Sequence, residues 1–491
     1  MLKIAYLFLI MVLLGSCLLH IPSQDENYIT EHPTAHFNIV PYRTFESLTK
    51  LGVVAFHIDG IEKVEYTIVD KNGDTLMDSV NVMTFNDRTG INEYWVKFNL
   101  SELSDGPLMV FADVKPNNGV TRHLDITIMN NSKHSLLYKN FYVHPTNGND
   151  ISGDGSSQSP FRTLTRALDY NTVSGGDNVI LMVEGHYEAP YRNAGGDQYT
   201  MVDRYITIKP APNLDRDEVV IISSNTELRT FLPKVSHLKW ENVTLDFTYE
   251  SNHFFRYMTR DNDYLWFDRC RITDNIPNLA DMEGSTYVGN IFERTFYYVT
   301  DSVAERGKFG FIYTALVRNS SVSNIIGDCY QMSKCILNCT VSDIDWEVVE
   351  HHTDIYQLWD EKDNILIYGL TGTNIFCQSF ILEPDRENKP GIETLRNSAF
   401  IDISIDNYYK NPEDEKRGGP PFSFLLGNFE NVLFKNINLS EQQIQMNVEN
   451  LAQPFTAKNV VFDNFHFFDY SYDRYVVGQK PLGVTFLGCH K

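Results

Sequence analysis

The 491-residue chain has too few basic residues and too few long apolar runs for two broad classes of protein. It carries 41 lysines and arginines against 64 aspartates and glutamates, a formal charge of −23 at pH 7. Nucleic-acid binding requires clustered basic side chains that neutralise phosphates, so this balance argues against a nucleic-acid partner. After residue 17, no stretch reaches the ~18 apolar residues that a membrane-spanning helix needs. We therefore expect a soluble body.

Cysteine is also sparse. Without Cys17 the chain keeps six cysteines, an even number that permits disulfides in an exported protein. None of them forms a paired CxxC zinc pattern, and Cys270 and Cys339 occupy equivalent positions of the repeat described below. We expect these two to be buried free thiols that act as small apolar residues.

Residues 1–17 have the pattern of an export signal. Lys3 precedes the apolar run Ile4–Leu14, and small residues follow before Cys17. The letters LGSC that end at Cys17 resemble a bacterial lipobox, in which the cysteine is acylated and becomes the mature N-terminus. Ordinary signal-peptidase cleavage and a retained anchor remain open. We expect an exported protein, either secreted or held at the cell surface or in the periplasm by a lipid at Cys17.

The length predicts two or more domains. Residues 18–36 read as a polar tether. Residues 37–131 carry short strand patterns separated by turn clusters such as Asp70–Asp74, which is typical of a small antiparallel β-sandwich. The phrase DGPLMVFADVKPNNG resembles Ig-like modules fused ahead of exported β-helix proteins, where they space or bind rather than catalyse. Residues 132–140 read as a linker.

From residue 141 to 491 the chain repeats one phrase: apolar-x-apolar-x-corner-apolar-x-apolar. A coil of a solenoid needs two such period-2 runs that meet at a residue able to adopt left-handed backbone geometry. The predicted corners are Asn242, Arg269, Asn319, Asn338, Gly369, Asp402, Asn436 and Asn464.

Before these repeats, Phe141–Asp169 holds a strand, a polar loop and a helix that begins near Ser159-Pro160. This phrase resembles the start of right-handed parallel β-helix proteins of the pectate-lyase-like superfamily, in which a helix caps the open end of the solenoid. The resemblance implies an all-β fold: a right-handed parallel β-helix with an N-terminal capping helix, preceded by an Ig-like β-sandwich. The Gly-His-Gly motif of polygalacturonases and a clear pectate lyase signature are missing, so no enzyme family is assigned.

A second repeat marks the candidate site. The sequence Asp328-Cys-Tyr-Gln331 recurs 26 residues later as Asp354-Ile-Tyr-Gln357, and Glu383 lies a further 26 residues after Gln357. Offsets of this size indicate stacked coils, whose equivalent positions lie about 4.8 Å apart. We expect Asp328 to stand over Asp354, and Gln331, Gln357 and Glu383 to form a polar row on a solvent-facing wall.

This pattern predicts acid–base chemistry. Two carboxylates about 5 Å apart cannot both ionise freely, so one of them keeps its proton to higher pH. Such a pair supplies the acid and the base of glycoside cleavage. His352 lies two residues before Asp354 and adds a group that titrates near neutral pH. The predicted catalytic residues are therefore Asp328, His352 and Asp354.

The predicted substrate-binding residues are Gln331, Gln357, Glu383 and Arg386, with Trp359 stacking on a sugar ring. The expected function is cleavage of a polysaccharide, by hydrolysis or by β-elimination, with no required cofactor.

Three alternatives remain open. The row of side chains stabilises the coil without any ligand, the protein is a non-catalytic glycan-binding or adhesin-like surface protein, or Asp328, Asp354 and Glu383 bind Ca²⁺, which favours clustered carboxylate oxygens.

Overall fold

The structure is a computed structural model that describes the chain in segments: residues 31–46, 48–169, 172–190, 201–222, 230–231, 235–246, 256–257, 264–273, 296–307, 310–345, 353–359, 362–383, 394–407, 422–425, 427–439, 443–446, 456–467 and 483–489. Strands make up 61% and helices 3% of the residues that the structure describes, so the expectation of a nearly all-β protein is confirmed. Within these segments, no helix is both long and apolar enough to cross a membrane.

Two mostly antiparallel sheets form the N-terminal part, with strand orders β1-β3-β7-β6 and β2-β9-β8-β4-β5. Their elements are β1 (Thr34–Phe37), β2 (Thr44–Phe45), β3 (Leu48–Phe56), β4 (Ile61–Asp70), β5 (Thr75–Val80), β6 (Thr84–Asn86), β7 (Ile91–Asn99), the 3-10 helix η1 (Leu100–Glu102), β8 (Gly106–Pro116) and β9 (Arg122–Asn130). β1 thus begins inside the stretch predicted as a tether. We call this two-sheet part the N-terminal sandwich.

Alternating residues build the core of the N-terminal sandwich. Along β4, Val64, Tyr66 and Ile68 are fully buried between more exposed neighbours, and they pack with residues of both sheets in one cluster. The hairpin after β4 closes because the Asp70 carboxylate accepts the backbone N–H of Asn72 at 2.8 Å and two further backbone N–H groups. The turn cluster predicted at residues 70–74 is therefore confirmed.

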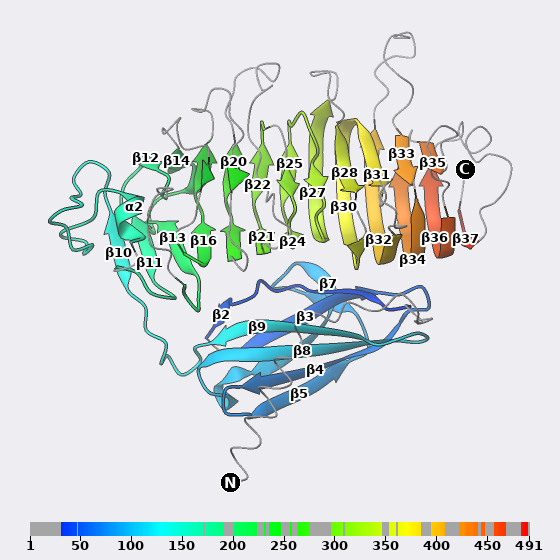
Figure 1. Cartoon of the computed structure of the whole chain (residues 1–491), viewed down its shortest axis with the longest axis horizontal. Coiled ribbons are helices and arrows are strands. Elements are labelled where there is room, and N and C mark those ends of the chain that lie inside the picture. The colour runs from blue at the N-terminus through cyan, green and yellow to red at the C-terminus, as the bar shows by residue number, and fades with distance from the viewer. Residues whose placement is uncertain are drawn as a thin grey trace. The chain divides into compact units, whose positions relative to one another are not determined.

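The remainder is a stack of parallel strands, which run in rows from β10 to β37 in Figure 1. The first strand row, row A, is β10 (Asn140–Val143), β11 (Asn178–Leu181), β13 (Ile206–Pro210), β16 (His237–Glu241), β19 (Tyr264–Asp268), β21 (Phe296–Thr300), β24 (Leu316–Arg318), β27 (Cys335–Asp345), β30 (Leu366–Phe376), β32 (Thr394–Asn407), β34 (Asn428–Leu439), β36 (Thr456–Phe467) and β37 (Val484–Leu487).

Row B is β12 (Gly185–Glu188), β14 (Val219–Ile222), β17 (Thr244–Asp246), β20 (Arg271–Thr273), β22 (Val303–Glu305) and β25 (Ser321–Ser323), and it continues in the second halves of the long strands of row A. Row C is β23 (Phe311–Ile312), β26 (Tyr330–Gln331), β28 (Asp354–Trp359), β31 (Gln378–Glu383), β33 (Phe422–Leu425) and β35 (Gln443–Met446). The remaining elements are α2 (Leu164–Ala167), η2 (Arg216–Glu218), β15 (Thr230–Phe231), β18 (Arg256–Tyr257) and β29 (Lys362–Asp363). The parallel rows are consistent with a β-helix.

The bends between rows A and B lie where the sequence predicts them. All eight predicted corner residues have positive φ, between 49° and 72°, as does Asp301, which lies in the interval where no corner was predicted. Their side chains bond one another along the stack: the amide of Asn436 donates to Asp402 at 2.7 Å, and Asn464 donates to Asn436 at 2.9 Å. Asparagine suits this position because it tolerates left-handed backbone geometry and also supplies a donor and an acceptor.

The short helix α2 lies between β10 and β11, in the stretch where a helix was predicted. The Thr163 side chain accepts the Arg166 backbone N–H and caps the helix, while Leu164 and Ala167 are buried in the β-helix core. A helix is thus present in the predicted stretch, but it begins at Leu164 rather than near Ser159-Pro160 and is only four residues long; its capping role stays a prediction.

The outer side of row A is covered by the N-terminal sandwich. A separate apolar cluster joins Val40, Val54 and Ile91 of the sandwich to outward residues of row A, among them Trp266 and Leu337. The N-terminal sandwich is thus packed against the β-helix.

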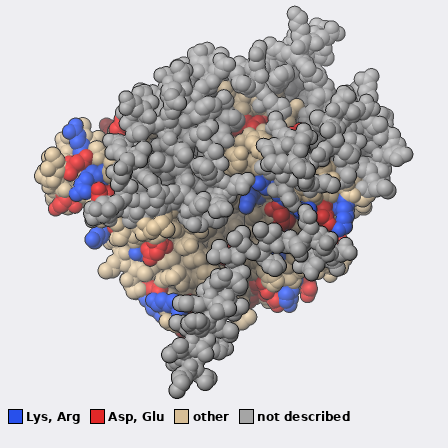
Figure 2. Space-filling model, viewed as in Figure 1, with Lys and Arg blue, Asp and Glu red and all other residues tan. Residues whose placement is uncertain are grey.

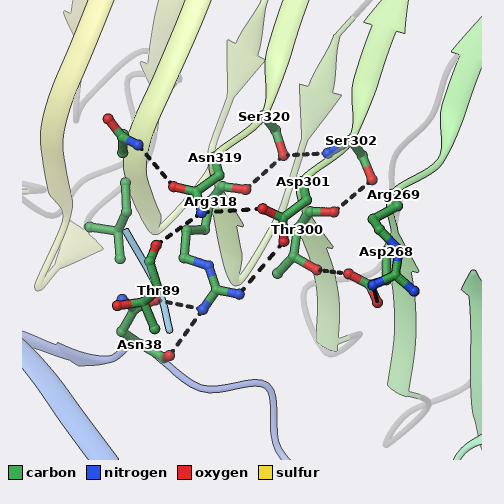
Figure 3. A network of polar contacts seen from close by, with 12 residues as sticks. Asn38, Thr89, Asp268, Arg269, Thr300, Asp301, Ser302, Arg318, Asn319 and Ser320 are labelled. Carbon is green, nitrogen blue, oxygen red and sulfur yellow. Dashed lines mark hydrogen bonds and ion pairs between the residues drawn. The ribbon is translucent and has the colours of Figure 1, made fainter. Parts of the chain in front are cut away.

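A polar network extends this contact (Figure 3). Arg318 on β24 is 4% exposed and donates from Nη1 to the backbone oxygen of Asn38 at 3.2 Å and to its side-chain oxygen at 3.0 Å. Next to it, the Asn319 amide donates to the Thr89 backbone oxygen at 2.9 Å. These bonds satisfy polar groups that the apolar contact would otherwise bury unpaired.

Candidate carboxyl–amide site

The repeated Asp/Gln phrase lies in row C, on neighbouring strands. β26 pairs with β28 in parallel, with Tyr330 opposite Tyr356 and Gln331 opposite Gln357. The two tyrosines belong to the β-helix core, so the two glutamines lie on the outer side of the row. The register predicted from the 26-residue offset is confirmed.

Hydrogen bonds join four polar residues into a carboxyl–amide cluster: Asp328, Gln331, Asp354 and Gln357. The Gln331 amide donates to Asp328 Oδ2 at 2.7 Å and to Gln357 Oε1 at 3.2 Å. The Asp354 backbone N–H donates to Asp328 Oδ1 at 3.2 Å, and the Asp354 carboxylate lies near enough for its charge to raise the pKa of Asp328. Because Gln331 points outward, its bond to Asp328 places that carboxyl group on the outer side as well.

The expectation of a solvent-facing wall is wrong for this cluster. Asp328 is 4% exposed, Asp354 0%, Gln331 5% and Gln357 6%. Ile312, which precedes Gln331 in the same outer row, is also fully buried. Sequence periodicity says which side of a strand a residue faces, but it does not say whether that side is covered.

Burial changes the chemistry of the pair. Loss of solvent raises the pKa of the Asp328 carboxyl group well above its ordinary value, and the negative charge of Asp354 raises it further. The Gln331 amide opposes this shift by donating to the charged form. One proton is therefore retained by the pair at a pH where an isolated aspartate has lost it, as expected from the stacking.

Glu383 does not continue the glutamine row. Gln357 pairs with Ile381, and Glu383 pairs with Trp359 at the end of the strand. The coil from β28 to β31 advances by 24 residues, whereas the preceding coil advances by 26. Trp359 and Glu383 are both half-buried. Within the described segments, no three histidine, cysteine, aspartate or glutamate side chains are placed to hold a metal ion, so Asp328, Asp354 and Glu383 do not assemble the Ca²⁺ site.

Three further predicted residues, His352, Arg386 and Cys17, lie outside the described residues. The cysteines in the described segments form no disulfides, and all of them except Cys489 are buried, as predicted for Cys270 and Cys339. Burial raises the pKa of both of these thiols to about 12, so neither supplies a thiolate at neutral pH.

A second concave region was not predicted from the sequence. A cleft of about 530 Å³ lies where the N-terminal sandwich meets the first coils, and its walls include Tyr138, Tyr142, Arg204 and Lys209. Its residues come from segments that are far apart in sequence, and no repeat connects them. The sequence signal that could have indicated this cleft is in β10, where the outward-facing residues Asn140 and Tyr142 alternate with residues that face the core.

Part of the chain resembles a known protein family. Residues 146–198 match a family model described as a protein of unknown function, DUF1565. This family is found in parallel β-helix proteins, which agrees with the parallel rows of this structure. None of the curated proteins compared with the chain matches it. The chain therefore has nearly all-β architecture consistent with a parallel β-helix, and its first coils resemble a family without an assigned activity.

Proposed function

We propose that the chain is an exported protein that cleaves a polysaccharide, with the Asp328–Asp354 pair as its acid and base. The observation that carries this proposal is the stacking of two buried aspartates in row C, which raises the pKa of Asp328 and so supports one retained proton. Glycoside cleavage needs one carboxyl group that still holds a proton and one that has lost it. The Gln331 amide fixes the orientation of the Asp328 carboxyl group, and Gln331 also donates to Gln357.

The proposal has a structural requirement. A polymer has to reach carboxyl groups that are 4% and 0% exposed, so the pair must become accessible when substrate binds. His352 remains the proposed third catalytic residue, with Arg386, Glu383 and Trp359 as proposed substrate contacts. Acid–base cleavage needs no cofactor, and addition of a chelator is expected to leave it unchanged.

The test is a screen of polysaccharides for new reducing ends and for the absorbance of unsaturated uronates. These two signals distinguish hydrolysis from β-elimination. Asp354→Asn and Asp328→Asn should each abolish the signal, while Asp343→Asn, at an exposed corner outside the cluster, should leave it unchanged. Turnover that persists in Asp354→Asn would remove the catalytic assignment.

The burial of the four side chains favours a second candidate function, a non-catalytic glycan-binding surface protein. In that case the cluster has only a structural role, and its mutation changes stability without affecting any reaction. Wild-type protein that binds a glycan without releasing products would select this candidate.

We further infer the finer features that go with either function. These are a right-handed β-helix of the pectate-lyase-like superfamily, Ig-like character of the N-terminal sandwich, and a lipid at Cys17. Metabolic labelling with a fatty acid tests the last point, since Cys17→Ala should remove the label and release the protein from the membrane fraction.

A further inference from the structure

The cleft between the N-terminal sandwich and the first coils has the features of a ligand site. Its volume of about 530 Å³ falls in the range of roughly 300–1,000 Å³ that is typical of small-ligand sites. The floor is the outer side of β10, β11 and β13, where Tyr142, Ile180 and Lys209 stand in register on adjacent strands. Tyr138, 59% exposed, lines the wall.

The walls are fixed before any ligand arrives. The segment predicted as a linker is bonded at both ends: the Leu136 backbone N–H donates to Asn131 Oδ1 at 2.9 Å, and the Lys139 backbone N–H donates to Asp177 Oδ1 at 2.8 Å. Asp177 itself is 1% exposed. A preformed cleft binds at a lower entropic cost than one that must order on binding.

Two cations face this cleft. Arg204 is 14% exposed in its side chain and is oriented by donating to Asp203 at 3.4 Å and to the Leu137 backbone oxygen at 3.5 Å. Lys209 forms no ion pair with any residue in the part of the chain that the structure describes. The lining contains one carboxylate, Glu46, at an exposed position.

Gly176 makes room for the arginine. Its φ is +89°, and a Cβ atom added there would lie 2.7 Å from Arg204 Nη1. A side chain at this position would therefore displace the guanidinium group as well as strain the backbone.

Neutral hydrogen-bonding groups stand beside the cations. The Asn178 amide donates to Asn140 Oδ1 at 3.0 Å, which leaves the Asn140 amide nitrogen and the Asn178 amide oxygen available to a ligand. Amides that bind hydroxyl groups, an aromatic ring for stacking and a planar guanidinium for a carboxylate are complementary to a sugar acid.

The charge of the molecule as a whole does not point to this ligand. On the face shown in Figure 2, the described acidic and basic side chains lie intermixed. The net charge of −23 disfavours an acidic partner at long range, but screening limits that effect to about 10 Å in ordinary salt. Contacts inside the cleft therefore decide its preference.

We propose that this cleft binds an acidic saccharide, with Arg204 and Lys209 contacting a uronate carboxylate and Tyr138 or Tyr142 stacking on a ring. The choice of a saccharide rests on the proposed function. The cleft itself is separate from the carboxyl–amide cluster, and its lining contains none of the four cluster residues.

The test measures equilibrium binding of labelled galacturonate and mannuronate oligomers and of a neutral galactose oligomer of the same length. The wild type should prefer at least one uronate oligomer over the neutral one. Lys209→Met should weaken that binding about tenfold to a hundredfold, because a charge-assisted bond is lost. Gly176→Ala and Tyr138→Ala should also weaken it. Lys435→Met, on an outward lysine of β34 that pairs with Asp463 at 2.9 Å, is the matched control and should bind like the wild type.

Each outcome separates this inference from the proposed function. Asp354→Asn should keep the wild-type affinity for the uronate oligomer while losing cleavage. A wild type that binds through Lys209 but cleaves nothing would disprove only the catalytic proposal. Equal affinity for acidic and neutral oligomers, no binding of either uronate, or no effect of both Lys209→Met and Gly176→Ala would overturn the cleft assignment.

Discussion

Replacing Asp354 by asparagine should stabilise the protein at neutral pH and leave it nearly unchanged in acid. In the wild type, burial and the Asp354 charge raise the pKa of the Asp328 carboxyl group, so the folded state holds a proton that the unfolded state has lost. Folding stability therefore falls as the pH rises from about 4 toward the raised pKa. Asparagine is nearly isosteric and carries no charge, so it removes the part of this effect that comes from Asp354.

The magnitude follows from proton linkage. One retained proton changes the free energy of unfolding by about 1.4 kcal/mol for each pH unit over which it is retained. The difference in stability between Asp354→Asn and the wild type should thus grow with pH by up to about this slope. All other titrating groups cancel in the difference.

The assay is thermal unfolding of both proteins at several pH values from 4 to 8, with Asp328→Asn and the double variant measured alongside. Asp328→Asn should show the same direction. The double variant should show the largest pH-dependent difference, because it also removes the part of the pKa shift that comes from burial. A difference that is independent of pH, or a variant that loses stability as the pH rises, would refute the proton-sharing pair.

Three further predictions concern the stability of the fold outside the carboxyl–amide cluster. At the corner residue Asn436, alanine should be less stable than glycine by about 1 kcal/mol, because both lose the ladder bonds but only alanine is strained at a φ of 53°; thermal unfolding of the two variants tests this. Arg318→Leu should cost about 3 kcal/mol and increase proteolysis between the N-terminal sandwich and row A, since Asn38 loses its buried donor; an unchanged digestion pattern would contradict this. Burial lowers the pKa of His36 to about 4, so its contribution to stability is present above about pH 6.5 and is lost as the pH falls toward 4; NMR titration of the imidazole should show it neutral at pH 5.5.

The corners and the glutamine register could be predicted from the sequence, because each depends on a local rule. A left-handed corner restricts the residue type, which is why Asn338 and Gly369 were recognisable, and an exact recurrence such as that of Gln331 and Gln357 reports one turn of the solenoid. Glu383 was misplaced because the next coil is two residues shorter, and coil length depends on the loops between rows. The Asp301 corner was missed for the same reason.

Burial was harder to predict, since it depends on what packs against a strand from outside. A signal for the covered side of row A did exist. Trp266, Tyr298 and Leu337 stand at the x positions of the repeat, where an open face carries polar side chains. No comparable signal marks the covered glutamines, because a polar residue at an outward position is also what an exposed wall shows.

The apolar cluster between the N-terminal sandwich and row A determines how a truncated protein without the sandwich should behave. A β-helix expressed by itself would expose one contiguous apolar surface to water, made of Trp266, Tyr298, Leu316, Leu337 and Leu366. Such a fragment should self-associate rather than report on the isolated solenoid. The N-terminal sandwich and the β-helix are therefore better regarded as one folding unit than as two independent parts.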